Sequence, residues 1–228
     1  GASTWYAKDV GDAAAQRFID ETLAEHRPND AVLSEEAADD SNRLTADRVW
    51  IIDPLDGTQE YSEFDRADWA VHIALWERKD ADGKPSDEGS ITQAAVALPA
   101  YNMTLSTHQL PKTPDRHEGK PRLVVSRNRA TREAVIVAEA LDCDVARLGS
   151  AGAKTMAVVL GEVDIYVHAG GMYQWDSAAP SAVAKAAGLH VSRIDGSPLK
   201  YNQESLWLPD FLVCRIELAE PALNALNP

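Results

Sequence analysis

Short apolar segments separated by polar turns fill the first half of the chain. The spacing of apolar positions predicts an amphipathic helix over residues 13–25, and the runs after it predict strands near residues 31–33, 49–52, 69–77, 90–98 and 102–107. The polar, turn-rich residues 79–89 predict a hairpin loop between two of these strands. The first half is therefore expected to form a sheet preceded by one long helix.

The pattern changes after a second polar loop at residues 111–120. Strands and helices now alternate, with strands expected near residues 122–126, 144–148, 163–168, 189–193 and 211–216, and helices over residues 131–141, 151–161 and 178–188. This alternation is typical of α/β units. We therefore expect an N-terminal α+β half, residues 1–115, and a C-terminal α/β half, residues 116–228, that share one cleft.

The apolar run at residues 49–52 leads directly into a pair of carboxylates. Pro54 lacks an N–H and is not expected to continue a central strand, so the chain should turn there. Across that turn Asp53 and Asp56 lie three residues apart, close enough to bind one hard cation, and the Leu55 carbonyl offers a further oxygen ligand. Taken alone, the segment fits equally well a tight surface turn with Asp-Pro and Asp-Gly punctuation.

The two residues after this turn point to phosphate binding. Gly57 allows a close backbone approach to a ligand. Its N–H and that of Thr58 are both available for a phosphate oxygen. The turn is therefore predicted to combine a metal site with a phosphate site.

Two more acidic segments suit such a site. Glu35 and Glu36 end a short apolar run 18 residues before Asp53, as expected for a neighbouring strand. Asp176 comes just before the alanine-rich residues 178–188, near the start of a predicted helix, where an N-cap role is the alternative to metal binding.

These segments together resemble the inositol monophosphatase superfamily of magnesium-dependent, lithium-sensitive phosphatases. The resemblance covers residues 12–211 and depends on two motifs, Trp50–Thr58 and Trp175–Pro180. Within that superfamily Ser34–Glu36, Gly149–Lys154 and Asp195–Asn202 look most like the CysQ branch, the 3'-phosphoadenosine 5'-phosphate phosphatases. The resemblance implies the layered αβαβα sandwich of the inositol monophosphatase and fructose-1,6-bisphosphatase type.

The resemblance also implies roles for individual residues. Two or three Mg²⁺ ions would be bound by four carboxylates and one carbonyl, from Glu35, Asp53, Leu55, Asp56 and Asp176. Li⁺ is the expected inhibitor. Asp12, 23 residues before Glu35, would activate the attacking water together with Thr58, and Glu36 is the third catalytic candidate.

Asp12 has an alternative role as the N-cap of the helix over residues 13–25. The family helix that precedes this position is not found before Asp12, so we expect that the chain lacks an N-terminal segment. In relatives that segment contributes to dimer packing, and a homodimer is therefore a candidate assembly.

Substrate contacts are expected from the second half of the chain. Candidates for binding phosphate or a nucleotide are Ser126, Arg127, Ser150, Lys154 and Tyr173. The alternative for the lysine is an exposed position on its helix. Arg129 stands where many nucleotide phosphatases of the family have a histidine, which weakens the expectation of strict nucleotide preference.

Two histidines, His72 and His168, lie in predicted strands. His168 precedes a glycine pair and is a weaker candidate for a substrate contact, whereas His72 lies in an alternating apolar strand and is predicted to be structural.

Composition narrows the classes of partner and compartment. The chain has 228 residues, 45% of them hydrophobic, and a net charge of −14. That charge argues against a nucleic-acid polymer as partner, because phosphate-backbone binders need a basic surface. No apolar run is long enough for a membrane span, and no signal peptide is evident. The two cysteines are expected to be reduced in a cytoplasmic protein.

Three functions remain open at this point. The leading one is Mg²⁺-dependent hydrolysis of the 3'-phosphate of 3'-phosphoadenosine 5'-phosphate to AMP, with 3'-phosphoadenylyl sulfate as a second candidate substrate and a link to sulfate assimilation. The second is inositol monophosphatase or fructose-1,6-bisphosphatase activity on the same metal core. The third is a non-catalytic phosphoinositide or nucleotide sensor, which would not need the hydroxyl of Thr58.

Overall fold

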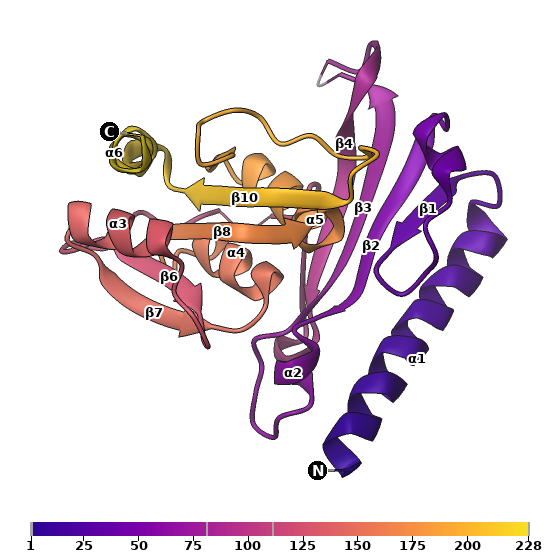
Figure 1. Ribbon diagram of the computed structural model, residues 1–228, viewed down its shortest axis with the longest axis horizontal. Coiled ribbons are helices and arrows are strands. Elements are labelled where there is room, and N and C mark those ends of the chain that lie inside the picture. Colours follow the sequence, from indigo (N-terminus) through magenta and orange to yellow (C-terminus); the bar gives the residue numbers. More distant parts are fainter. Residues whose placement is uncertain (1, 81, 111, 228) are drawn as a thin grey trace.

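The computed structural model describes residues 2–80, 82–110 and 112–227, with side chains from residue 10 onward. Two five-stranded sheets form its framework (Figure 1). The first has the order β1-β2-β3-β4-β5, with bounds Ala31–Ser34, Arg48–Asp56, Ala70–Lys79, Pro85–Leu98 and Met103–Ser106. Its strands β1 and β2 are parallel, and the other neighbours are antiparallel.

The second sheet has the order β7-β6-β8-β10-β9. In chain order, its strands β6 to β10 span Arg122–Ser126, Asp144–Leu148, Ile165–Tyr173, His190–Ser192 and Trp207–Cys214. Strand β6 is parallel to β7 and β8, whereas β10 is antiparallel to β8 and β9.

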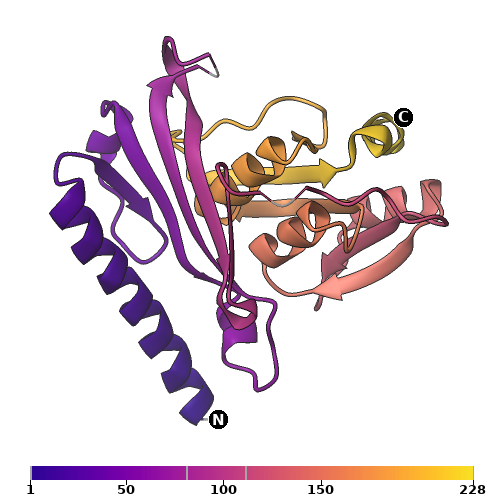
Figure 2. The same cartoon turned by 180° about the vertical axis from the view of Figure 1, so that it is seen from behind.

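Helices form three layers around and between the sheets. In chain order, α1 to α6 span Ala2–His26, Thr58–Tyr61, Arg132–Ala140, Ala151–Val159, Gln174–Ala186 and Ile216–Leu226, with short 3₁₀ turns at Ser41–Leu44 and Pro99–Tyr101. Helix α1 packs on the first sheet, α4 and α5 lie between the sheets, and α3 and α6 cover the far face of the second (Figures 1 and 2). The predicted αβαβα sandwich is confirmed.

Two apolar cores hold these layers together. The larger joins the first sheet, α4, α5 and the facing side of the second sheet, through side chains such as Ile51, Val96, Met156 and Phe211. The smaller joins the second sheet to α3 and α6. Burial of apolar surface on both faces of the second sheet is the expected stabilising force for such a sandwich. Among the described residues no helix is both long and apolar enough to cross a membrane.

Helix α1 corrects the expected start of the first helix. It runs from Ala2 to His26 and therefore includes Asp12, so the N-cap alternative for Asp12 is wrong. Gly11 weakens the helix signal before residue 13. It is tolerated because a Cβ there would lie only 2.5 Å from the ring of Tyr61 on α2, so glycine permits close packing of the two helices.

Strand β2 corrects the turn expected at Pro54. The strand continues to Asp56, although its pairing with β3 shifts register between Asp53 and Asp56. This irregularity contains the proline, and the missing N–H is therefore accommodated in a central strand.

Other boundaries also differ from the prediction. Helix α5 begins at Gln174 and strand β4 begins at Pro85, which shortens the predicted hairpin loop. The expected last strand ends at Cys214, and the C-terminal helix α6, which the sequence analysis did not predict, follows it.

Candidate functional site

The carboxylates of the first sheet meet where β1 ends beside β2. Ser34, the last residue of β1, pairs with Ile52 of β2, so Glu35 follows the end of β1 next to Asp53, which lies within β2. The Glu35 N–H donates to the Ile52 carbonyl over 3.3 Å. Burial, together with the charges of Glu36 and Asp56, raises the pKa of Glu35.

Asp53 is the buried centre of this acidic group, with a side chain that also interacts with Glu35. Burial and the charges of Asp56, Glu35 and Asp176 raise the pKa of Asp53 well above its usual range. Burial and the Asp56 charge likewise raise the pKa of Asp176, to about 7. Carboxylates from β2 and α5 are thus close enough to repel one another, as expected at a site for a hard cation.

Asp176 also supports the start of its own helix. It is the third residue of α5, and its Oδ2 accepts the Tyr173 N–H over 2.7 Å. The N-cap position belongs to Tyr173, so the N-cap alternative for Asp176 is wrong.

Asp56 is held at the N-terminus of α4. Its Oδ2 accepts the Gly152 N–H over 2.6 Å, and its Oδ1 lies 3.3 Å from the Ala151 nitrogen. Nε2 of His72 lies 3.2 Å from the same Oδ2. Burial disfavours the charged form, but His72 and the Gly152 N–H outweigh it and lower the pKa of Asp56.

His72 lies against the acidic group and was not predicted to take part in it. It pairs directly with Asp53 across β2 and β3. Ligand atoms of Asp53, Asp56 and His72 all lie within 4.8 Å of one another. The position of His72 beside Asp53 is only weakly signalled in the sequence. It depends on the register between β2 and β3, which is set by the irregular connection between these strands.

The turn after Asp56 packs against α4. Gly57 has a φ of +89°, and a Cβ there would lie 2.9 Å from the Cβ of Ser150, so glycine is required for both backbone conformation and space. Thr58 begins α2, and its Oγ1 donates to the Leu55 carbonyl over 3.2 Å. The hydroxyl predicted to help activate water, on Thr58, is therefore in direct contact with the predicted carbonyl ligand of Leu55.

Asp12 is half-buried on α1, and the contacts around it place its helix beside the acidic group. Gln16, one turn later on the same face, accepts the Ser34 hydroxyl over 2.6 Å, just before Glu35. Gly11 packs against Tyr61 of α2. The segment that carries Asp12 thus lies between the end of β1 and the helix that begins at Thr58.

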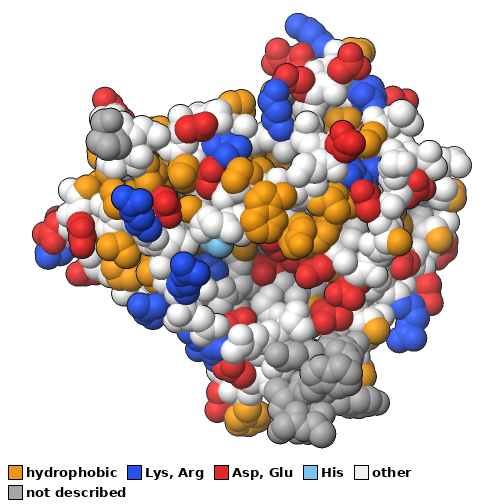
Figure 3. Space-filling model, in the orientation of Figure 1, with side chains coloured by type: hydrophobic (Ala, Val, Ile, Leu, Met, Phe, Trp, Pro, Cys, Tyr) orange, Lys and Arg blue, Asp and Glu red, His pale blue; other side chains and the backbone are white. Residues whose placement is uncertain are grey.

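A cleft of about 380 Å³ opens beside these carboxylates. Seven predicted residues line it, namely Asp56, Gly57, Ser126, Ser150, Lys154, Tyr173 and Asp176, and so do Glu60, His168 and Trp207. Figure 3 shows acidic side chains around a hollow near the centre of this face, next to a group of hydrophobic side chains. Asp12, Glu35, Glu36, Asp53, Leu55, Thr58 and Arg127 are not among the lining residues.

Lys154 supplies positive charge to the cleft. It is 3% exposed, so the alternative of an exposed helix lysine is wrong. Its Nζ donates to the Ser150 carbonyl over 2.9 Å and also to the Gly149 carbonyl. Burial lowers its pKa to about 8, against the opposing effect of nearby carboxylates.

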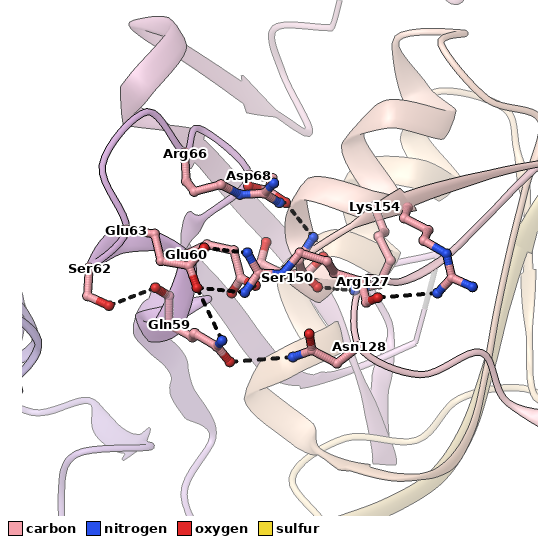
Figure 4. Close-up of polar contacts among 12 residues, drawn as sticks. Gln59, Glu60, Ser62, Glu63, Arg66, Asp68, Arg127, Asn128, Ser150 and Lys154 are labelled. Carbon is pink, nitrogen blue, oxygen red and sulfur yellow. Dashed lines mark hydrogen bonds and ion pairs between the residues drawn. The ribbon is translucent and has the colours of Figure 1, made fainter. Parts of the chain in front are cut away.

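Arg127 connects the second sheet to the segment that follows Thr58 (Figure 4). Its Nη2 donates to Glu63 Oε1 over 2.8 Å and lies 3.4 Å from Glu60 Oε1. The Gly149 N–H donates to Asp68 Oδ2 over 2.6 Å, a second link between the same regions. A substrate contact for Arg127 stays a prediction, because the arginine is paired with these carboxylates.

Two aromatic rings, those of Tyr173 and Trp207, line one side of the cleft, and the buried Trp175 packs behind them. Tyr173 stacks on Trp175 with ring centroids 4.8 Å apart, and Trp207 meets the Tyr173 ring edge-on at 5.6 Å. Tyr173 is 45% exposed and Trp207 is 50% exposed, so both present apolar surface to a ligand. Trp207 was missed because it lies far from every motif.

Comparisons with known proteins agree with this geometry. The model of the inositol monophosphatase family matches residues 9–220. The 3'-phosphoadenosine 5'-phosphate phosphatase of Mycobacterium bovis is 50% identical over 225 residues, which cover 97% of this chain and 82% of that protein. The 3'(2'),5'-bisphosphate nucleotidase CysQ of Escherichia coli K12 is 32% identical over 90% of this chain and 83% of its own.

A solved structure supports the same fold. Inositol monophosphatase II from Staphylococcus aureus superposes with a TM-score of 0.75 at 20% identity, covering 95% of this chain and 84% of that one. At this identity the similarity shows the fold alone.

Proposed function

Because the chain belongs to the inositol monophosphatase family, we propose that it is a metal-dependent phosphatase that hydrolyses the 3'-phosphate of 3'-phosphoadenosine 5'-phosphate, giving AMP and phosphate. The observation that carries the proposal is the convergence of carboxylates from β1, β2 and α5 beside a cleft with a buried lysine. Half of the residues are identical to those of a mycobacterial protein named for this activity. 3'-Phosphoadenylyl sulfate is a second candidate substrate, which would link the protein to sulfate assimilation.

The donor set fits Mg²⁺. Glu35, Asp53, Asp56 and Asp176, with the Leu55 carbonyl, would hold two or three ions through oxygen atoms, which hard divalent cations prefer. Burial, and after it repulsion between the carboxylates, raises the pKa values of Asp53 and Asp176, and a bound cation would favour their charged forms. Mg²⁺ would supply charge neutralisation to the phosphate and a lowered pKa to the attacking water. Li⁺ is the proposed inhibitor.

The side chains and backbone around the ions would carry out the remaining steps. Asp12 and the Oγ1 of Thr58 would orient the attacking water, and the Asp12 carboxylate would take up its proton, with Glu36 close to the ligands. The N–H groups of Gly57 and Thr58 would hold the phosphate oxygens.

The second half of the chain would bind the rest of the substrate. Ser150 caps α4 at the edge of the cleft, and the buried Lys154 adds positive charge there. Ser126 and Arg127 are proposed as further polar contacts, and Tyr173 offers a ring to the base. In this scheme residues 1–115 supply most metal ligands, and residues 116–228 supply Asp176 and the specificity residues. A cytoplasmic location and a homodimer are part of the same proposal.

Phosphate release by the purified protein tests the proposal. We expect rapid release from 3'-phosphoadenosine 5'-phosphate with Mg²⁺, slower release from inositol 1-phosphate and fructose 1,6-bisphosphate, and inhibition by millimolar Li⁺. Preference for either of the other two substrates would show that the specificity assignment is wrong. Binding of phosphorylated ligands without any release would favour a sensor.

A further inference from the structure

His72 lies at the meeting point of four elements. It belongs to β3 and is completely buried. Around its imidazole lie Asp56 at the end of β2, Gly152 in the first turn of α4 and Trp175 in the first turn of α5. The imidazole therefore lies between Asp56 of the first sheet and the first turn of α5, which carries Asp176.

Each ring nitrogen has a defined neighbour. Nδ1 lies 3.1 Å from the Trp175 carbonyl oxygen, which can only accept, so Nδ1 carries a proton. Nε2 lies 3.2 Å from Asp56 Oδ2. Trp175 directly precedes Asp176 in α5. The rigid ring of His72 therefore bridges Asp56 of the first sheet and the turn of α5 that carries Asp176.

The space around Nε2 is closed. A Cβ on Gly152 would lie 2.1 Å from Nε2, so only glycine fits there. The same Gly152 donates its N–H to Asp56 Oδ2, the oxygen that faces the histidine. Asp56 Oδ2 thus accepts the Gly152 N–H and lies at ion-pair distance from Nε2, which is buried and makes no hydrogen bond of its own among the described residues.

We propose that His72 is a positioning residue for the metal centre, which fixes Asp56 and the first turn of α5 so that Asp56 and Asp176 keep the separation that Mg²⁺ binding requires. The proposal rests on the proposed phosphatase function for its role in catalysis. Groups that orient metal ligands commonly change metal affinity or activity by about 10–100-fold when they are removed. His72 acts here through the carboxylates and does not itself ligate Mg²⁺, which prefers oxygen.

Two near-isosteric variants separate the two contacts. In His72→Asn the amide nitrogen takes the place of Nδ1 and keeps the donor to Trp175, but the contact with Asp56 is lost. In His72→Gln the longer side chain brings an amide donor toward Asp56. Tyr201→Phe is the matched control, because it removes buried hydrogen bonds from Tyr201 to Ser177 and Ser181 on the same α5 but leaves His72 and its two contacts in place.

The readouts are the Mg²⁺ concentration for half-maximal phosphate release and the Mg²⁺-induced rise in unfolding temperature. We expect His72→Asn to raise the half-maximal Mg²⁺ concentration about 10–100-fold. In His72→Gln this increase should be at most half as large on a logarithmic scale. Tyr201→Phe should leave the half-maximal Mg²⁺ concentration unchanged. The thermal shift does not depend on turnover, so it tests His72 even if the wild-type protein hydrolyses none of the substrates, a result that would contradict only the proposed function.

Three results would overturn the proposal. Both histidine variants would bind Mg²⁺ like the wild type if the ring only fills space. An equal loss in Tyr201→Phe would make the effect a general consequence of loosening α5. A loss of Mn²⁺ or Co²⁺ binding with unchanged Mg²⁺ binding would identify His72 as a direct ligand of transition metals.

Discussion

Replacing Asp176 with asparagine should stabilise the metal-free protein while it abolishes activity. The asparagine amide oxygen can still accept the Tyr173 N–H, so the helix start keeps its hydrogen bond. What disappears is a negative charge that burial and Asp56 disfavour. When a buried charge serves to bind a ligand, its removal is expected to stabilise the ligand-free protein and to abolish function.

The size of the effect follows from the pKa. The pKa of Asp176 rises from 3.8 to about 7 in the fold. Because a raised carboxyl pKa favours the protonated folded form, the free energy of unfolding falls as the pH rises from 3.8 to about 7. At about 1.4 kcal/mol per pKa unit, the raised pKa of this carboxyl costs the metal-free fold on the order of 4 kcal/mol at pH 8. At pH 5, where the group is ionised only in the unfolded chain, the cost is on the order of 2 kcal/mol.

Urea unfolding in EDTA at pH 5 and pH 8 measures this directly. Asp176→Asn should exceed the wild type in free energy of unfolding at both pH values, and by more at pH 8. The control is Asp87→Asn, whose carboxylate is fully exposed, and it should change stability by less than about 0.5 kcal/mol. Saturating Mg²⁺ should remove or reverse the difference. A variant less stable than the wild type at pH 8 without metal would refute the reasoning.

Three further predictions concern the turn after the carboxylates and its contacts. Thr58→Ala should lower kcat by about 10²–10⁴-fold while Thr58→Ser retains most activity, and equal rates for the two variants would contradict a role for the hydroxyl. Gly57→Ala should lower the free energy of unfolding by about 1–3 kcal/mol, because its φ is +89° and its Cβ would lie 2.9 Å from Ser150. An unchanged urea midpoint would show that the turn adapts. Arg127→Ala should leave the urea midpoint of global unfolding almost unchanged but speed hydrogen exchange in residues 58–68, and unchanged exchange there would contradict the proposed link between the sheets.

Much of the fold could be predicted from local patterns. The strands of both sheets were located from short apolar runs, and the αβαβα class came from the resemblance carried by the Trp50–Thr58 and Trp175–Pro180 segments. Errors arose where tertiary contacts outweigh local signals. Pro54 was expected to end its strand, but a register shift against β3 accommodates it, and Gly11 is retained in α1 by close contact with Tyr61.

The site residues that lie within the two motifs could be predicted from the sequence. The resemblance supplied Asp53, Asp56 and Asp176, and the structure brings these carboxylates near one another. His72 and Trp207 could not be placed from sequence, since each depends on distant pairing: His72 on its register with Asp53, and Trp207 on its ring contact with Tyr173. Local patterns cannot encode a contact whose geometry depends on an irregular connection.

Phosphate release from 3'-phosphoadenosine 5'-phosphate by the wild type and by Asp53→Asn, each at several Mg²⁺ concentrations, tests the central claim most directly. The wild type should release phosphate only with Mg²⁺ and lose activity with millimolar Li⁺. Asp53→Asn should keep its fold, as judged by circular dichroism, and show no turnover, because Asp53 lies at the buried centre of the carboxylates. Near-wild-type hydrolysis in this variant, or hydrolysis by the wild type that is unaffected by removal of Mg²⁺, would contradict the account.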